Sequence, residues 1–238
     1  MKSLIYCISI ILFTITAHTC NQVQGNGNII KKVVEISDYD NLKIAGKAEI
    51  IYEQKDTLPY LQIEIDENLF SLLDIESENG KLSIKANGNK DINPTQFIIR
   101  TNSKELASLN LAGSNSLHLN GTVKSDSLNI ILAGSSKIKA DSIIVDNIKL
   151  EAAGSGNINL CGTAQTITCN LAGSSELNIL ELKAENVKCS IAGSGDIATY
   201  AEKTLYVSIA GNGKISYKGN PEISKKIAGS GKIINLNQ

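Results

Sequence analysis

Apolar and polar residues alternate along most of the chain, and the alternation recurs at a nearly fixed period. With the glycine of each Ala-Gly pair as reference, the copies lie 18 to 21 residues apart, at positions 113, 134, 154, 173, 193, 211 and 229. The residues two, four and six positions before each glycine and four positions after it are apolar, with Lys225 as the one clear exception. The residue three positions after each glycine is polar. A period of two with one apolar face predicts short β-strands.

Identical apolar positions at a fixed period favour one all-β architecture. If the chain winds into coils of about 18–21 residues, each strand can pair in parallel with the same strand of the coil before, and the apolar positions become buried columns. The pattern therefore predicts a parallel β-helix, or β-solenoid, in which Ile138, Ile158, Leu177 and Ile197 lie in one file. An antiparallel sandwich or barrel also has short alternating strands but does not explain the fixed period.

The repeated phrase AGSG is interpreted as a turn between two strands of a coil. Glycine tolerates positive φ, alanine is small enough for a corner, and the residue two positions after the glycine is Asn, Ser or Gly in every copy. The alternative is a calcium-binding β-roll, whose nonapeptide repeat requires an Asp in every turn. Only Asp196 follows a glycine in that way. The phrase thus indicates architecture and not a metal site.

The N-terminal third is less regular. The segment LKIAGKAEI at 42–50 repeats the phrase once, which places the start of the first coil near Asn28, but the phrase is lost between 51 and 105. Strand-like alternation continues there, DENLFSLLDIE is compatible with a short helical turn, and Asn79-Gly80 indicates a tight turn. Longer, less regular coils are expected, with a more polar last coil that protects the C-terminal end of the solenoid.

The first residues have the features of an export signal. MKSLIYCISIILFTITAHTC has a Lys at position 2, an apolar run and a small-residue stretch, and it is too short to span a membrane. We expect residues 1–19 to be a signal peptide of lipoprotein type, Cys20 to be the lipidated first mature residue, residues 20–27 to be a linker, and residues 28–238 to be a single β-helix domain. Ordinary signal-peptidase cleavage with an incidental Cys20 is the alternative. The expected location is the outer membrane or periplasm, or otherwise the medium, with membrane contact only through the anchor.

Charge and cysteine content limit the range of functions and covalent links that the chain can have. The chain has a formal net charge of −1 and a single arginine, Arg100, so nucleic-acid binding is not expected. Beyond the signal region, Cys161, Cys169 and Cys189 remain, an odd number that excludes a complete internal disulfide framework. Cys169 and Cys189 fall in the same inward column of adjacent coils. Neighbouring parallel strands give poor disulfide geometry, so free buried thiols are expected.

Three stretches resemble a known family: CNQVQGNGNIIKKVVEISDYDNLKIAGKAEIIYEQKD at the entry, the AGSG[DNK]I coils, and YKGNPEISKKIAGSGKI at the end. Together they are similar to the GIN domain, the head domain of auto-transporter adhesins, common in secreted and lipid-anchored Bacteroidetes proteins. The resemblance covers about residues 25–236. It implies a right-handed parallel β-helix and suggests adhesion, but it brings no established activity, site residues or cofactor.

No catalytic, cofactor-binding or metal-ligating residues are assigned from the sequence. Outward positions carry acids that are interpreted as a solvated face, because Lys and Asn occupy the same columns: Asp126, Asp141, Asp146, Glu151, Glu176, Glu181 and Asp196. His118, the one histidine beyond the signal region, is expected to be merely exposed, and no nucleophile motif accompanies it. No Cys/His metal-ligand spacing occurs. Tyr200, Tyr206 and Tyr217 are a candidate sugar-binding patch, although Tyr217 has inward parity.

We therefore expect a non-catalytic cell-envelope protein, an adhesin or a β-solenoid that binds a glycan or a cell-surface protein. The alternative is a carbohydrate-active enzyme, a polysaccharide lyase or hydrolase, because such enzymes need acidic groups that outward columns of a β-helix can present. Self-association through the coil ends is a third hypothesis, and an oligomer is compatible with it.

Overall fold

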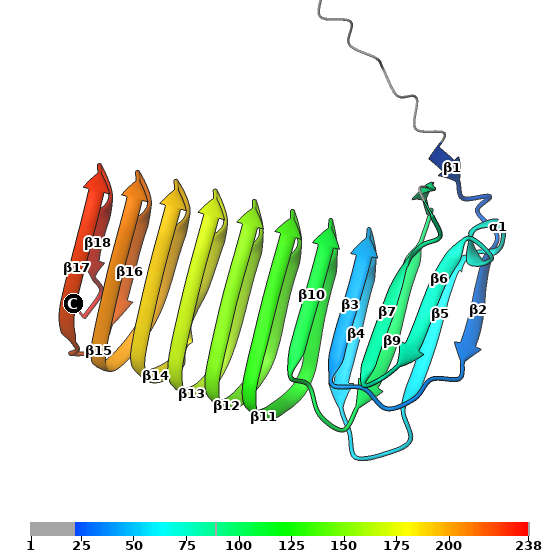
Figure 1. Ribbon diagram of the computed structural model, residues 1–238, viewed down its shortest axis with the longest axis horizontal. Helices are drawn as coiled ribbons and strands as arrows, with labels where there is room; N and C mark the ends of the chain where they lie inside the picture. The colour runs from blue at the N-terminus through cyan, green and yellow to red at the C-terminus, as the bar shows by residue number, and fades with distance from the viewer. Residues whose placement is uncertain (1–21, 89, 238) are drawn as a thin grey trace, which may run out of the picture.

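Five long strands form the regular part of the molecule, and each spans most of one coil: β11 (Ser116–Gly134), β12 (Lys137–Gly154), β13 (Asn157–Gly173), β14 (Glu176–Gly193) and β15 (Asp196–Gly211). The computed structural model describes residues 22–88 and 90–237, so the expected signal peptide and Cys20 lie outside the described residues. The long strands pair in parallel in chain order, which gives the row of stacked coils in Figure 1. The predicted β-solenoid is confirmed.

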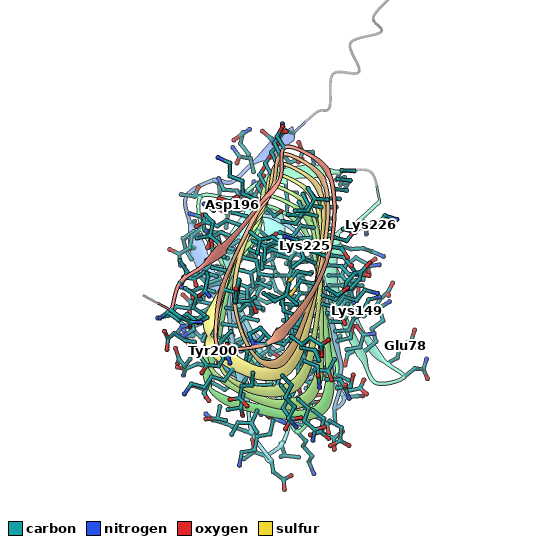
Figure 2. The ribbon with its side chains drawn as sticks, turned by 90° about the vertical axis from the view of Figure 1, so that its left-hand side faces the viewer. Glu78, Lys149, Asp196, Tyr200, Lys225 and Lys226 are labelled. Atoms are coloured by element: carbon teal, nitrogen blue, oxygen red, sulfur yellow. The ribbon has the colours of Figure 1, made fainter. Side chains whose placement is uncertain are left out.

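Each coil is a flattened loop with two faces. Every long strand runs down the first face, bends, and returns along the second face to the Ala-Gly pair, so the coil has a bend edge and a turn edge (Figure 2). Figure 2 views the C-terminal end: the chain descends from Asp196 to Tyr200 on one side and ascends past Lys225 and Lys226 on the other. The coil therefore turns counterclockwise as it approaches the viewer, and the solenoid is right-handed.

Apolar side chains fill the space between the two faces. Ile138 pairs with Ile158, Ile158 with Leu177 and Leu177 with Ile197, and all four are buried. Cys169 and Cys189 lie opposite each other in another inward column, fully buried and not joined by a disulfide. Burial raises the pKa of the Cys169 thiol well above its ordinary value. Both predictions, the stacked file and the free buried thiols, are confirmed.

The Ala-Gly phrase forms the turn edge, as predicted. Each phrase glycine pairs with its equivalent in the next coil and has a φ between +102° and +133°. A Cβ at Gly173 would lie 2.7 Å from the carbonyl oxygen of Gly154 in the coil before, and one at Gly193 would lie 2.5 Å from that of Gly173. Stacking and positive φ thus both require glycine here.

Polar side chains at the turn edge are buried but hydrogen-bonded between coils. The Asn115 backbone N–H donates to Ser136 Oγ over 3.2 Å, and Ser136 Oγ donates to the Gly113 carbonyl over 3.3 Å. Ser175 makes the same pair of bonds, accepting from Gly156 N–H and donating to the Gly154 carbonyl. These side chains provide hydrogen-bond partners for backbone groups that, at the turn, do not pair with a neighbouring strand.

Shorter strands complete the solenoid at both ends of the regular part. On the N-terminal side β3 (Asn41–Gly46) and β4 (Glu49–Gln54) form one coil, and β10 (Ser108–Gly113) leads into β11. On the C-terminal side are β16 (Lys214–Lys218), β17 (Glu222–Gly229) and β18 (Lys232–Asn235). β3 and β4 precede the insertion at 55–107 in sequence, yet they pair with β10 and β11. The chain therefore leaves the stack after β4, builds the N-terminal end, and returns.

The N-terminal end is a cap with antiparallel pairing, which the sequence did not indicate. Its elements are β1 (Gln22–Gln24), β2 (Ile29–Val34), β5 (Tyr60–Asp66), α1 (Glu67–Phe70), β6 (Leu73–Glu78), β7 (Lys81–Ala86), β8 (Asp91–Asn93) and β9 (Phe97–Ser103). β5 is antiparallel to β2 and β9, and β6 is antiparallel to β7. The short helix occurs as predicted, and so does the turn at Asn79-Gly80, where both residues have positive φ. The segment expected to be a linker contributes β1, which pairs with β8.

Asp66 joins the start of the described chain to the cap. Its buried carboxylate accepts hydrogen bonds from the backbone N–H groups of Gly27 at 2.7 Å and Thr95 at 2.8 Å. Burial alone raises the pKa of Asp66, but these hydrogen bonds to the charged form outweigh burial and the pKa is lowered.

The C-terminal end leaves one edge of the stack uncovered. Every residue of β17 is exposed, including Ile223 and Ile227, which continue core columns. Lys225 pairs with the buried Val207 and places a charge in an otherwise apolar column. Lysine at such a position opposes the addition of another strand or coil.

Candidate functional site

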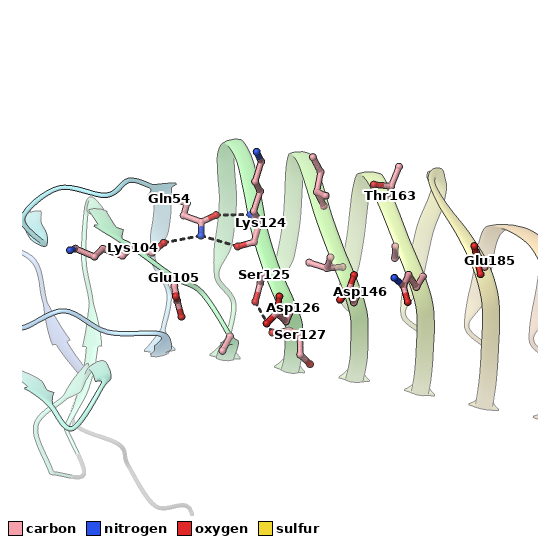
Figure 3. A pocket seen from close by; sticks show the side chains of 15 residues that line it. Gln54, Lys104, Glu105, Lys124, Ser125, Asp126, Ser127, Asp146, Thr163 and Glu185 are labelled. Carbon is pink, nitrogen blue, oxygen red and sulfur yellow. Dashed lines mark hydrogen bonds between the residues drawn. The ribbon is translucent and has the colours of Figure 1, made fainter.

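An open groove with a volume of about 850 Å³ lies on the bend edge. Both faces of the stack stay in register, so the long strands, which have 16 to 19 residues, absorb their length differences at the bend, where the register shifts occur. The groove follows the solenoid axis across the bends of β11, β12, β13 and β14 (Figure 3). We call it the axial groove.

Gln54 forms the N-terminal wall of the axial groove. Its side-chain Nε2 donates to the carbonyls of Lys104 and Lys124, each over 2.9 Å, and its Oε1 accepts from the Lys124 backbone N–H (Figure 3). One glutamine side chain thus bridges the cap and the first long coil. The wall is held by three hydrogen bonds, and the groove is preformed at this end.

Carboxylates from successive coils line the floor. Asp126 and Asp146 lie between paired neighbours on β11 and β12 and so stack on adjacent coils, about 4.8 Å apart along the backbone. The same position, eight residues before the reference glycine, is occupied in chain order by Glu105, Asp126, Asp146, Gln165, Glu185 and Lys203. Lys203 forms an ion pair with Glu185 at 2.7 Å. The groove therefore presents a line of hydrogen-bond acceptors with excess negative charge.

This line of acids lies at the bend and not in the strand columns near the glycine, so the period-two pattern of the sequence does not reveal it. Asp126 and Asp146 were interpreted as parts of a solvated face, and the structure brings these two together in the groove. The signal was present in the position eight residues before the glycine, where acids recur in four of seven copies.

The other predicted outward acids do not line the axial groove. Each takes part in surface contacts or lies in water: Lys149 pairs with Glu151 at 2.7 Å, Lys214 pairs with Asp196 at 2.8 Å, and Asn157 hydrogen-bonds to Glu176. Glu181 is exposed. For these acids the interpretation as a solvated face agrees with the structure.

His118 is more than an exposed side chain, because it contacts Asp141 of the next coil. Its Nε2 lies 2.8 Å from Asp141 Oδ1, while Asp141 Oδ2 accepts from the Gly121 backbone N–H. The hydrogen bond to His118, together with that from Gly121, lowers the pKa of Asp141. The pair lies outside the axial groove, and no hydroxyl side chain of residues 22–88 or 90–237 hydrogen-bonds to His118. A Ser/His/Asp triad is not assembled there.

The three tyrosines do not form a patch. Tyr217 is buried, as its inward parity indicated, whereas Tyr200 and Tyr206 alternate with buried residues at two separate places along β15, before and after its bend. Each outward ring lies under a lysine of the preceding coil, 5.7 Å from Lys183 Nζ for Tyr200 and 5.5 Å from Lys188 Nζ for Tyr206. Cation–π contacts therefore hold these rings against the solenoid.

An apolar strip follows the turn edge of the second face. It consists of the alanines that precede the reference glycines and neighbouring aliphatic side chains, and it borders a shallow groove of about 530 Å³. Elsewhere, among the residues that the structure describes, no group of three or more His, Cys, Asp or Glu is arranged to hold a metal ion. No helix in the described part of the chain could span a membrane.

Comparison with known proteins gives a consistent result. The family model described as "Putative auto-transporter adhesin, head GIN domain" matches residues 38–221. Among curated proteins, no match was found.

Several solved structures share the fold. A protein of Parabacteroides distasonis, named a putative lipid binding protein, is 38% identical with a TM-score of 0.76, and the alignment covers 91% of this chain and 100% of that one. A putative adhesin of Parabacteroides merdae is 26% identical with a TM-score of 0.74, covering 91% and 99%. A putative adhesin of Bacteroides fragilis, at 24% identity and a TM-score of 0.82, covers 90% and 100% and supports the fold alone.

Proposed function

The chain belongs to the family of auto-transporter adhesin head GIN domains, and from this premise we propose that it is a non-catalytic, cell-envelope glycan-binding protein that uses the axial groove. Residues 1–19 are its signal peptide, and Cys20 is its lipidated first residue. An adhesin family, an export signal and a groove across four consecutive coils together support a surface-exposed binding module.

The observation that carries the proposal is the line of acceptors on the groove floor. Asp126, Asp146, Gln165 and Glu185 offer carboxylate or amide oxygens at the spacing of successive coils. Sugar hydroxyls donate well to carboxylates, and such charge-assisted bonds are about twice as strong as neutral ones. An extended chain of neutral sugars lying along the solenoid axis would meet one acceptor per coil. An anionic chain is disfavoured because the line carries excess negative charge.

A glycan array with matched variants tests this function. The groove variant is Asp126→Asn with Asp146→Asn, and the control is Glu78→Gln with Glu222→Gln, which removes two exposed carboxylates outside the groove. Loss of one charge-assisted bond of about 1.5–3 kcal/mol predicts at least a tenfold weaker affinity for the groove variant. The control should bind like the wild type. Equal glycan binding by both variants would show that the axial groove does not bind the glycan.

The alternative function, hydrolysis of a polysaccharide, is favoured by the stacking of Asp126 on Asp146. Two carboxylates on one glycosidic bond are the requirement of glycoside hydrolysis, at about 5–9.5 Å depending on stereochemistry. The same array ligands, incubated with wild-type protein and examined for new reducing ends, separate the two functions. Binding without product supports the adhesin, and product that disappears in the groove variant supports the hydrolase.

A further inference from the structure

A second pocket, separate from the axial groove, lies on the outer side of the N-terminal cap. It has a volume of about 360 Å³ and opens between β4, β5, β9 and the loop 55–59. β5 and β9 are antiparallel here, with Tyr60 paired to Asn102 and Gln62 paired to Arg100. The side chains of these paired residues therefore lie next to one another on the same face of the sheet. This volume suits a ligand of the size of one sugar ring.

Hydrogen bonds to β9 hold the loop 55–59, which closes the pocket, in place. Asn102 is buried, and its Nδ2 donates to Thr57 Oγ1 at 3.1 Å and to the Leu58 carbonyl at 3.3 Å. The Lys55 backbone N–H donates to the Ser103 carbonyl at 2.9 Å, which continues the pairing of β4 with β9 into the loop. A ligand would thus meet a preformed wall and would not bear the entropic cost of ordering the loop.

Two cations, Lys55 and Arg100, and one carboxylate, Glu53, line the pocket. Lys55 is paired with Glu53, which leaves Arg100 as the cation with unused donors. Arg100 contacts Glu64 through Nε at 3.7 Å, and Glu64 is shared with Lys31 at 3.5 Å. Within the described residues, no hydrogen bond occupies the terminal guanidinium nitrogens of Arg100. A guanidinium with two parallel donors is the side chain that best recognises a carboxylate.

Apolar surface lines the same pocket. Leu58 is 89% exposed and Tyr60 is 38% exposed, and both line the pocket. Four of the nine exposed large hydrophobic residues in the described chain belong to this cap, on β2, β5 and the loop, whereas the bends of β11 to β14 carry only Ile144. An aromatic ring beside a cation suits a ligand that has one apolar face and one anionic group.

We propose that this pocket binds a carboxylate-bearing sugar, with Arg100 on the carboxylate and Tyr60 against the ring. We call it the cap pocket. The site goes beyond the neutral glycan assigned to the axial groove, and its chemistry is opposite in sign. The ligand can be a free sugar acid or the terminal residue of an acidic glycan, since both present the same carboxylate and ring.

The test is an amide NMR titration of the wild-type domain with four probes: glucuronate, methyl β-glucuronide, glucose and acetate. The proposal expects glucuronate or its methyl glycoside to shift resonances of β5, β9 and the loop 55–59 with a dissociation constant of about 1 mM, and glucose and acetate to bind at least tenfold more weakly. Stronger binding of the methyl glycoside indicates the end of a glycan, whereas stronger binding of glucuronate indicates the free sugar acid.

Two variants keep the test specific. Arg100→Gln should weaken glucuronate binding at least tenfold, whereas Lys43→Gln, which removes an exposed cation outside the pocket, should leave it within about twofold. Both variants must retain wild-type amide spectra away from the substitution; if Arg100→Gln does not, Tyr60→Leu replaces it. The proposal is overturned if glucose binds as well as glucuronate, if neither acidic probe shifts the pocket resonances, or if Arg100→Gln binds normally. The groove variant should bind glucuronate normally, so failure here is distinguishable from failure of the groove function.

Discussion

Replacing Gly193 by alanine perturbs the stacking of coils at a single defined point. Gly193 has a φ of +131°, and a Cβ built on it would lie 2.5 Å from the carbonyl oxygen of Gly173. That oxygen also accepts the hydrogen bond from Ser194 N–H at 2.9 Å, so it cannot move away without weakening the ladder. The variant therefore combines an unfavourable backbone conformation with a steric clash between neighbouring coils.

The two contributions can be separated because Gly46 starts the same glycine column. Its φ of +133° is nearly the same, but nothing lies within 4 Å of a Cβ built there. Gly46→Ala should therefore lose only the conformational part, about 1–2 kcal/mol of unfolding free energy. Gly193→Ala should lose that amount and about 2 kcal/mol more, from overpacking against backbone and a strained hydrogen bond.

Urea denaturation followed by circular dichroism measures both values. The m-value must be compared as well, because a solenoid can unfold in parts when one interface between coils is weakened. The unfolding free energy should be highest for the wild type, lower for Gly46→Ala and lowest for Gly193→Ala, with a difference of about 2 kcal/mol between the two variants. Equal destabilisation of both variants would refute the reasoning, since φ alone would then explain the glycine column.

Three further predictions concern the ends of the chain. Asp66→Asn should lose about 2 kcal/mol of unfolding free energy at pH 7. Because the folded-state pKa is lowered, the stabilisation is present above the unfolded pKa of about 3.9 and lost as pH falls through the folded pKa, so the wild-type and variant curves of stability against pH should converge in acid. Lys225→Val should restore the apolar column of β17 and produce concentration-dependent association in sedimentation experiments, whereas Lys226→Val should not. Cys20→Ala should abolish metabolic labelling with palmitate and release the protein from the membrane fraction; unchanged labelling would contradict lipidation.

The stack could be predicted from the sequence because its cause is local and repeated. Each coil places apolar residues such as Ile138 and Ile158 at fixed distances from a glycine, and parallel pairing is the arrangement that brings equal positions together. Lys225 could likewise be identified as an exception, and the structure places it at the open end.

The N-terminal cap could not be predicted in the same way. β3 and β4 precede the cap strands β5 to β9 in sequence but lie between them and β10 and β11 in space, so the repeat is interrupted by a return of the chain. The alternation of apolar and polar residues in the insertion predicts which side chains of a strand face inward, but it does not predict whether the strand runs parallel or antiparallel to its neighbours. The antiparallel pairing of β5 with β2 and β9 depends on tertiary contacts that no period encodes.

The candidate sites were the least predictable feature. The axial groove depends on how coils of different length bend, and the cap pocket joins Tyr60 to Asn102, residues 42 apart in sequence. In the sequence, Arg100 differs from other residues only in being the single arginine. Its partners and exposure follow from the antiparallel sheet, which the sequence did not reveal.

The central claim, that stacked coils present a line of acceptors to a neutral glycan, is tested most directly by mapping a bound oligosaccharide from the array with amide NMR. The account predicts that shifts follow one line along the solenoid, at and beside Asp126, Asp146, Gln165 and Glu185. Shifts confined to the alanine strip of the turn edge, or the absence of any bound neutral glycan, would contradict it.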